Sequence, residues 1–330
     1  MKLAASGPAR AGAGNEASHG RLTAVARMYY LDGLGQHEIA EILGISRSQI
    51  SRLLTRAREL GIVRISVDDY DPRDRELESR LLGAFGLRHA VVIRTAERGV
   101  AQVRRTTGYF AAPAVAELIR PGMTVGLAGG RTLAAVVEYL VPCPGVRGLV
   151  AVQLMGNIGP AASEIDAVEL SRVLAQRFVG AFYTINAPAI AQDRSARDLF
   201  LAHDHIRTVW RLFDSLQLAL VGIGSLQESA FIERGVLSAA ERGELSRAGA
   251  VGEICGRYYD SHGRECHSAL RDRVISIDLD TLRRCPDVVA ITNGRSRAPA
   301  VRAALEGGLV TSLVIDDGGA EALLALKGTR

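Results

Sequence analysis

Residues 36–58, QHEIAEILGISRSQISRLLTRAR, constrain the fold of this 330-residue chain more than any other segment. Apolar side chains recur there at the spacing that two short, steeply crossing helices must bury, at Ile39, Ala40, Leu43, Ile45, Ile50 and Leu53. Gly44 stands where the chain must turn sharply, and glycine tolerates the positive φ that such a turn needs. Ser46 is placed to cap the second helix. The segment therefore predicts a helix-turn-helix, whose second helix is shaped to enter the major groove of DNA.

The polar face of the second helix carries neither an acid nor an apolar side chain. The residues that we expect to contact DNA are Gln36, Ser46, Arg47, Ser48, Gln49, Ser51, Arg52 and Arg56. Residues 1–65 hold nine Lys or Arg and five Asp or Glu, so the whole net charge of +4 lies in this part of the chain. Since neutralisation of phosphates drives DNA affinity, the charge favours DNA binding over an ordinary helical hairpin with a solvated face. An excess of +4 per chain is modest, and we expect at least a dimer.

The chain is long enough for a second domain with a sizeable core. We expect a disordered tail over residues 1–19, a helix-turn-helix domain over 20–67 and a second domain over 68–330. A first helix is expected over residues 22–31 and a short strand over 62–67, before Asp68, Asp69, Asp71 and Pro72 mark the boundary. A charged helix should follow over 73–85.

The composition favours an intracellular compartment. The N-terminus lacks the apolar run of a signal peptide, and no stretch approaches 18 uncharged apolar residues. The cysteines form no CxxC pair, so reduced thiols in the cytoplasm are the simplest interpretation. The spacing of Cys255, His262, Cys266 and His267 matches no structural zinc pattern. We therefore expect a cytoplasmic protein with no metal and no cofactor.

Short apolar runs alternate with helix-length segments after residue 85, which predicts an α/β domain with a doubly wound, mainly parallel sheet. The expected strands are residues 90–93, 124–127, 149–154, 181–185, 218–223, 288–292 and 309–315. Ligands of such sheets bind beyond the carboxyl ends of the strands. The loops that follow these strands are therefore the places to search for a site.

Two of these loops are suited to hold an anion. Gly129, Gly130, Arg131 and Thr132 follow one strand and open a helix, where backbone N–H groups and the helix dipole favour negative charge. Asn293, Gly294 and Arg297 lie in a second loop of the same kind, after another strand. The alternative is that both are simple polar turns. Gln153, Gly156 and Asn157 end a further strand and could add amide and backbone contacts. The glycines Gly222 and Gly224 lack the third glycine of a dinucleotide fingerprint, and we reject a cofactor site there.

Four segments in order make the chain resemble the SorC family of sugar-binding transcriptional regulators over nearly its whole length. They are GLGQHEIAEILGISRSQISRLLTRARELGIVRI, GLAGGRTL, GAVGEICGRYYDSHG and AALEGGLVTSLVIDD. The resemblance implies that the larger domain is similar to phosphosugar isomerases and glucosamine-6-phosphate deaminases and binds a phosphorylated sugar or polyol. It also implies a tetramer that holds operator DNA. Gly130, Arg131 and Thr132 would hold the phosphate or sugar, joined by Gln153, Gly156, Glu253 and Arg273.

The chain departs from the family pattern at three of these positions. A bulky or hydroxyl-bearing residue is usual where Gly129 stands, a lysine is usual where Arg297 stands, and an aspartate is frequent where Glu253 stands. An arginine binds phosphate as a planar fork and not as a point charge, so the geometry of the site can differ. These departures leave the identity of the effector open.

The sequence thus predicts a transcriptional regulator, repressor or activator, of a carbohydrate or polyol catabolic operon, controlled by a phosphorylated sugar-like effector. One alternative is a phosphosugar isomerase- or deaminase-like enzyme fused to a DNA-binding module. Such an enzyme needs a positioned acid/base set, and the histidines suggest none. A second alternative is a sigma-type subunit of RNA polymerase, whose promoter-reading region has a similar helix-turn-helix. The long α/β remainder of the chain argues against it.

Overall fold

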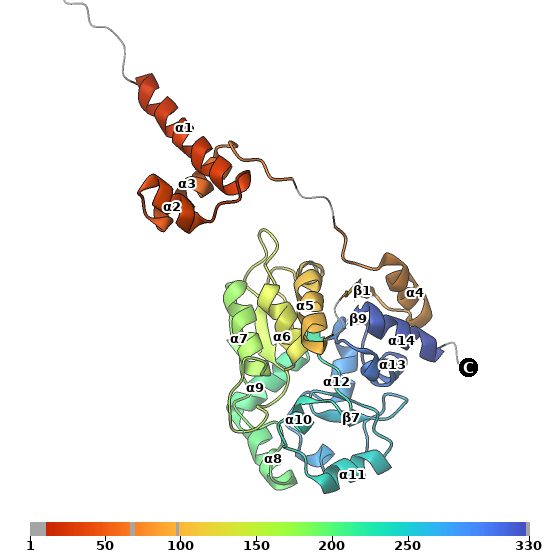
Figure 1. Cartoon of the computed structure of the whole chain (residues 1–330). Helices are drawn as coiled ribbons and strands as arrows, with labels where there is room; N and C mark the ends of the chain where they lie inside the picture. The colour runs from red at the N-terminus through yellow and green to blue at the C-terminus, as the bar shows by residue number, and fades with distance from the viewer. Residues whose placement is uncertain (1–10, 67–69, 97–98, 328–330) are drawn as a thin grey trace, which may run out of the picture. The chain divides into compact units, whose positions relative to one another are not determined.

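The computed structural model describes residues 11–66, 70–96 and 99–327. For residues 11–17 it describes the backbone and not the side chains. The chain divides into two compact units, Met1–Asp71 and Pro72–Arg330 (Figure 1). The boundary expected between residues 67 and 68 lies outside the described residues. Within the described part of the chain, no helix has the length and apolar character needed to cross a membrane.

The N-terminal unit contains α1 (Ala11–Tyr30), α2 (Gln36–Leu43) and α3 (Arg47–Glu59). The helices bury a small apolar core formed by Val25, Ile39, Ala40, Ile50 and Leu54. Gly44 ends α2 in the left-handed conformation with φ 64°, and Ser46 caps α3. The predicted helix-turn-helix is confirmed, with Leu54 as a buried position that the sequence pattern missed.

Two local predictions for this unit were wrong. Residues 11–19, expected in a disordered tail, are part of α1, because the packing of Leu22, Val25 and Ala26 anchors a helix that extends back through an alanine-containing segment. Residues 62–66, expected in a strand, form none. The described residues of this unit offer them no partner strand, and Ile62 and Val63 instead pack beside Leu22, Ala26 and Ala57. Residues 1–10 and Val67 lie outside the described residues.

The second unit is built on a parallel sheet with the order β1-β9-β8-β5-β2-β3-β4, which has seven strands within the described residues. The strands are β1 (His89–Ile93), β2 (Thr124–Leu127), β3 (Val150–Gln153), β4 (Ala181–Tyr183), β5 (Leu218–Val221), β8 (Val288–Ile291) and β9 (Ser312–Asp316). Each one overlaps a strand expected from the sequence, and the predicted fold class is confirmed.

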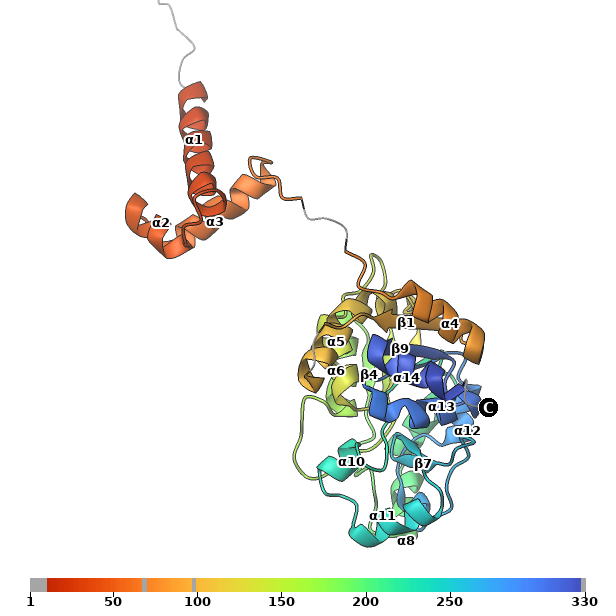
Figure 2. The ribbon, with the colours of Figure 1, turned by 45° about the vertical axis from the view of Figure 1, so that its right-hand side comes forward.

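Helices cover both faces of the sheet, and alternate strand residues point into two separate cores. One face packs against α5 (Val100–Ala116), α6 (Arg131–Tyr139) and α7 (Ala167–Arg177). The other packs against α4 (Arg75–Phe85), α9 (Asp204–Phe213), α12 (Leu279–Arg284), α13 (Ala298–Glu306) and α14 (Asp317–Lys327). Figure 2 shows α5 and α6 on one side of the strands and α13 and α14 on the other. The remaining helices are α8 (Arg194–Ala202), α10 (Ala230–Glu233), α11 (Ala239–Arg247), η1 (Arg271–Arg273) and η2 (Arg295–Arg297).

The strand order reverses between β2 and β5. From β2 the chain proceeds outward through β3 and β4, and from β5 it proceeds the other way through β8 and β9. Such a reversal opens a crevice at the carboxyl ends of the two central strands. The topology therefore selects one place for a ligand among all the loops.

A hairpin of β6 (Gly252–Ile254) and β7 (Arg257–Tyr259), which the sequence pattern did not reveal, borders this crevice. Its two-residue turn has φ 53° at Cys255 and 79° at Gly256, as a type I′ turn requires. Gly224 and Glu253 exchange two backbone hydrogen bonds of 2.9 Å. The hairpin is thereby fixed to the loop after β5, and it places Glu253 beside the crevice.

Candidate anion pocket and DNA-reading surface

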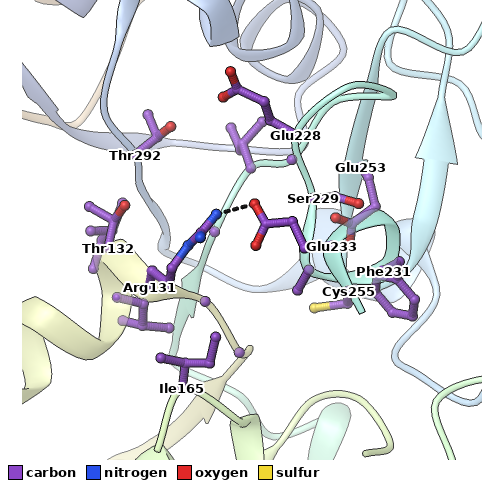
Figure 3. Close-up of a pocket in the computed structure, with 18 of the residues that line it drawn as sticks. Arg131, Thr132, Ile165, Glu228, Ser229, Phe231, Glu233, Glu253, Cys255 and Thr292 are labelled. Carbon is purple, nitrogen blue, oxygen red and sulfur yellow. Dashed lines mark hydrogen bonds and ion pairs between the residues drawn. The ribbon is translucent and has the colours of Figure 1, made fainter. Parts of the chain in front are cut away.

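A cavity lies at the carboxyl ends of β2, β5 and β8, where the strand order reverses (Figure 3). The loop Gly129–Thr132 follows β2, Gly222–Gly224 follows β5, and Thr292 follows β8; all of them line the cavity. The Thr132 hydroxyl donates to Oδ1 of Asn293 at 2.7 Å. The two loops that the sequence marked as anion sites are thus in direct contact.

The first of these loops presents the start of a helix to the cavity. Gly130 has φ 143°, a backbone conformation that side chains rarely permit, and α6 begins at the next residue. The first-turn N–H groups of a helix have no acceptor inside it and carry its positive dipole end. Gly129 lies against backbone: a Cβ there would stand 3.0 Å from the Ile165 oxygen. Its lack of a side chain lets the segment before α7 close on the loop.

Arg104, Arg131 and Arg297 all line this cavity. They also line a second, adjoining chamber, whose walls include Asn293, Gly294 and Glu321. Burial lowers the pKa of the Arg104 guanidinium, and the positive charges of Arg131 and Arg297 lower it further. The Nε of Arg104 is buried without a hydrogen-bond partner in the part of the chain that the structure describes. Like charges gathered around a free donor form a place where an anion is favoured. The sequence pattern missed Arg104, which lies in α5 and belongs to no motif.

Carboxylates from the segment after β5 partly balance these charges. Glu233 of α10 pairs with Arg131, the contact drawn as a dashed line in Figure 3. Glu228 Oε2 lies 3.1 Å from Nη2 of Arg297 and accepts a hydrogen bond of 3.3 Å from the Ser296 hydroxyl. The sequence pattern gave no signal for either glutamate.

The remaining wall of the cavity mixes hydrogen-bonding groups with apolar ones. Glu253 is 7% exposed, and burial raises the pKa of its carboxyl to about 7 although the Gly256 N–H donates to it. The Thr292 hydroxyl is buried and has no hydrogen-bond partner among the described residues. Ser229, Phe231 and Cys255 lie on the Glu253 side (Figure 3). A ligand with hydroxyl groups could bond to Thr292 and Glu253 while its anionic group meets the arginines.

The other predicted effector residues lie outside the lining of this cavity. Gln153 is buried; its Nε2 donates to the Met155 oxygen at 2.7 Å and to Asn157 Oδ1 at 3.0 Å. A Cβ on Gly156 would stand 2.4 Å from the Pro188 oxygen, so this glycine permits close backbone packing. Arg273 donates to the Ala191 oxygen at 2.9 Å and pairs with Glu241 at 2.6 Å. These contacts stabilise the framework, and an effector contact by any of these residues stays a prediction.

Asn293 and Gly294 line the adjoining chamber. The Gly294 N–H donates to Oδ1 of Asp316 at 2.6 Å, and Nη1 of Arg297 donates to the backbone oxygen of Asn293 at 2.9 Å. The loop thereby holds the Arg297 guanidinium between the two chambers.

The predicted DNA-contacting residues lie on the solvent-exposed side of α3 and its turn, except Gln36, which is half-buried. The Gln49 N–H donates to the Ser46 hydroxyl at 3.3 Å, and the Ser46 N–H donates to Oε1 of Gln49 at 2.9 Å. This capping box fixes the start of α3 and occupies two side chains that we expect to contact DNA. Arg56 pairs with Glu59 at 3.0 Å, whereas Arg47 stands exposed in the first turn.

Each of the two units matches a known protein family. Residues 72–325 match the family model described as "Putative sugar-binding domain", and residues 21–59 match that of sigma-70, region 4. The chain is 31% identical over 304 residues to the sorbitol operon regulator of Klebsiella pneumoniae, covering 91% of this chain and 96% of that one. It is 29% identical over 301 residues to the deoxyribonucleoside regulator of Bacillus subtilis, with 91% and 95% covered. The crystal structure of the full-length Klebsiella regulator, SorC, has a TM-score of 0.74 at 30% identity and covers 92% of this chain and 98% of its own.

These matches decide between the alternatives left by the sequence. The likeness to a sigma subunit is confined to the helix-turn-helix, and the large unit matches the sugar-binding model. The relatives are regulators and not enzymes.

Proposed function

The chain belongs to the SorC family of sugar-binding transcriptional regulators, and on this premise we propose that it controls a carbohydrate or polyol catabolic operon in response to a phosphorylated sugar-like effector. The helix-turn-helix unit reads operator DNA, and the α/β unit binds the effector in the cavity beside α6. The names of the relatives connect them with sorbitol and with deoxyribonucleosides, a polyol and a class of compounds that contain a sugar.

The observation that carries the phosphorylated effector is the gathering of Arg104, Arg131 and Arg297 beside the N-terminus of α6. A phosphate group has charge close to −2 and three acceptor oxygens, which suit guanidinium forks and first-turn N–H groups. The buried Thr292 hydroxyl and the Glu253 carboxyl supply partners for hydroxyl groups on the rest of the ligand.

The experiment is calorimetric titration of the full chain with sorbitol 6-phosphate and with unphosphorylated sorbitol, on wild type and Arg131→Ala. We expect the phosphorylated compound alone to bind, and Arg131→Ala to weaken it by about ten- to a hundredfold, the effect of losing one charge-assisted hydrogen-bonding partner. Arg172→Ala, which removes a half-exposed arginine paired with Glu169 on α7, is the matched control and should leave affinity unchanged. Equal binding of sorbitol and no effect of Arg131→Ala would replace the phosphorylated effector with a neutral polyol.

Sensing also requires that the effector change the affinity for DNA, a coupling typically of about 1–3 kcal/mol. Arg131→Ala should move the effector's influence on DNA binding to about ten- to a hundredfold higher effector concentration and leave the operator affinity of the effector-free protein nearly unchanged. An influence on DNA binding at the same effector concentration as in wild type would place the sensing site elsewhere.

We further propose that the regulator acts in the cytoplasm as a homo-oligomer. A net charge of +4 per chain supports few phosphate contacts, so two-fold related half-sites would be bound together. A dimer is the minimum, and the family resemblance favours a tetramer. Sedimentation at micromolar concentration, with and without operator DNA, tests the assembly; a monomer under both conditions would contradict it.

A further inference from the structure

The chain's own carboxylates already pair with two of the arginines that we expect to bind the effector's anionic group. Glu233 pairs with Arg131, and Glu228 pairs with Arg297 at 3.1 Å. Both glutamates belong to the short segment between β5 and α11, so one stretch of chain supplies internal counter-ions to two loops from other strands. Figure 3 shows Arg131 and Glu233 reaching toward each other across the cavity.

These carboxylates can leave without unfolding the segment. The side chains of Glu228 and Glu233 are 47% and 37% exposed, so rotation of their side-chain torsions can release them into solvent. The backbone beneath is held separately: the Glu228 N–H donates to the Ser225 hydroxyl at 3.0 Å, and Phe231 is buried. An incoming anion therefore competes with the two side chains and not with the fold.

Two classes of anion differ in what they gain when they replace these carboxylates. A ligand carboxylate that replaces Glu233 exchanges one carboxylate–guanidinium pair for an equivalent one, so it gains little. A phosphate dianion has more charge and a third acceptor oxygen, with which it can also reach Arg104, whose Nε has no hydrogen-bond partner among the described residues. Only an anion that bonds to more arginines than the glutamates do should displace them with a net gain.

We propose that Glu228 and Glu233 set the affinity threshold of the cavity: as internal competitors for Arg297 and Arg131, they lower the affinity of every anion, so that a phosphate dianion still binds and a carboxylate does not. The inference rests on the proposed function, because it concerns the same anion site. It adds that acidic residues of the chain keep weakly bound anions out, while its arginines supply the preference for phosphate.

The test is calorimetric titration of the full chain with inorganic phosphate and with acetate, at fixed ionic strength and slightly basic pH. Glu233→Gln and Glu228→Gln keep the side-chain shape and remove the competing charge. Since these pairs are partly exposed and screened, each substitution should raise the affinity for phosphate by roughly three- to tenfold and the affinity for acetate by no more than that. Acetate binding should therefore become measurable at concentrations at which wild type binds none.

Glu321→Gln is the matched control, because Glu321 pairs with Arg295 at 2.5 Å in the adjoining chamber and contacts neither Arg131 nor Arg297 in the structure. It should leave both affinities unchanged, and thermal melting checks that every variant is folded. If wild type binds phosphate, Arg131→Ala loses it and the glutamate variants match wild type, the internal competition is refuted while the proposed function stands. If neither wild type nor the Glu228→Gln/Glu233→Gln double variant binds phosphate, the phosphate site itself is refuted.

Discussion

The two units of this protein assemble their functional surfaces in opposite ways. The proposed DNA-reading surface is formed by one helix and the turn before it, so neighbours in sequence are neighbours in space. The proposed anion cavity joins residues far apart in the chain: the Arg131–Glu233 pair spans 102 positions and the Thr132–Asn293 bond spans 161. A surface made locally depends on a small helical core, whereas a surface made from distant loops depends on the topology of a whole sheet.

The comparison predicts that damage to the small core affects DNA binding alone. Ile50 is fully buried in α3, and Ile50→Ala should destabilise the N-terminal unit by about 2–5 kcal/mol through lost burial and the cavity that remains. Such a loss is a large part of the stability of a small domain, so operator binding should disappear. Thermal melting by circular dichroism, operator binding and phosphate titration would be measured together.

Ile42→Ala is the control for this substitution, because Ile42 on α2 is 60% exposed and its truncation should change stability by less than about 0.5 kcal/mol. Loss of phosphate binding together with operator binding in Ile50→Ala would show that the two units are coupled in stability and would contradict this contrast.

A second prediction concerns the cost of placing an acid in the cavity wall. Burial raises the pKa of the Glu253 carboxyl from 4.5 to about 7. Between these two pH values the carboxyl is protonated in the folded chain and ionised in the unfolded chain. Stability should therefore fall as pH rises from about 4.5 to about 7 and then show no further loss from this group. Glu253→Gln should remove this dependence and be more stable than wild type above pH 7 by roughly 1–3 kcal/mol.

Denaturant unfolding across this pH range, on wild type and Glu253→Gln, measures the difference. Parallel stability curves for the two proteins would mean that the carboxyl is ionised in the folded state, and the cavity wall would then be more solvated than its burial indicates.

The same contrast explains what the sequence could predict. Spacing of apolar residues revealed the helix-turn-helix and every strand of the parallel sheet among the described residues, because both patterns repeat within a few positions. The glycine-containing loop before α6 was also visible, since strand, glycine, arginine and helix follow one another. Arg104, Glu228 and Glu233 were not visible: each is a charged residue like many others on the surface, and only the packing of α5 and the segment after β5 brings them to the cavity. The β6–β7 hairpin was missed because its strands have three residues each, too few for a periodic signal.

A third prediction tests whether the exposed face of α3 reads bases. Arg47 projects from the first turn, the part of a recognition helix that meets base edges. Arg47→Ala should weaken operator binding by about 1–3 kcal/mol and relax specificity at one base pair. Binding to operators with single substitutions, at fixed salt, would measure both effects.

Arg27→Ala removes the same charge from α1, where Arg27 is exposed and lies 3.9 Å from Asp32. It should weaken all sequences to a small and similar degree. If Arg47→Ala behaved like this control, Arg47 would contact phosphates and the base contacts would have to come from other residues of α3.

The smallest expected effect separates two roles of one residue. The Ser46 hydroxyl accepts the Gln49 N–H at 3.3 Å, and Ser46→Ala should destabilise the N-terminal unit by about 0.5–2 kcal/mol through loss of this cap. Ser46→Asp keeps an acceptor at the same position and adds a negative charge at the helix N-terminus, so stability should stay close to wild type. The same charge would repel a DNA phosphate near α3, so operator affinity should fall although the helix is intact. Melting curves and operator titrations on the two variants measure the roles independently. A Ser46→Asp protein that binds operator as tightly as wild type would place the start of α3 away from the DNA backbone and would confine the contacts to residues farther along the helix.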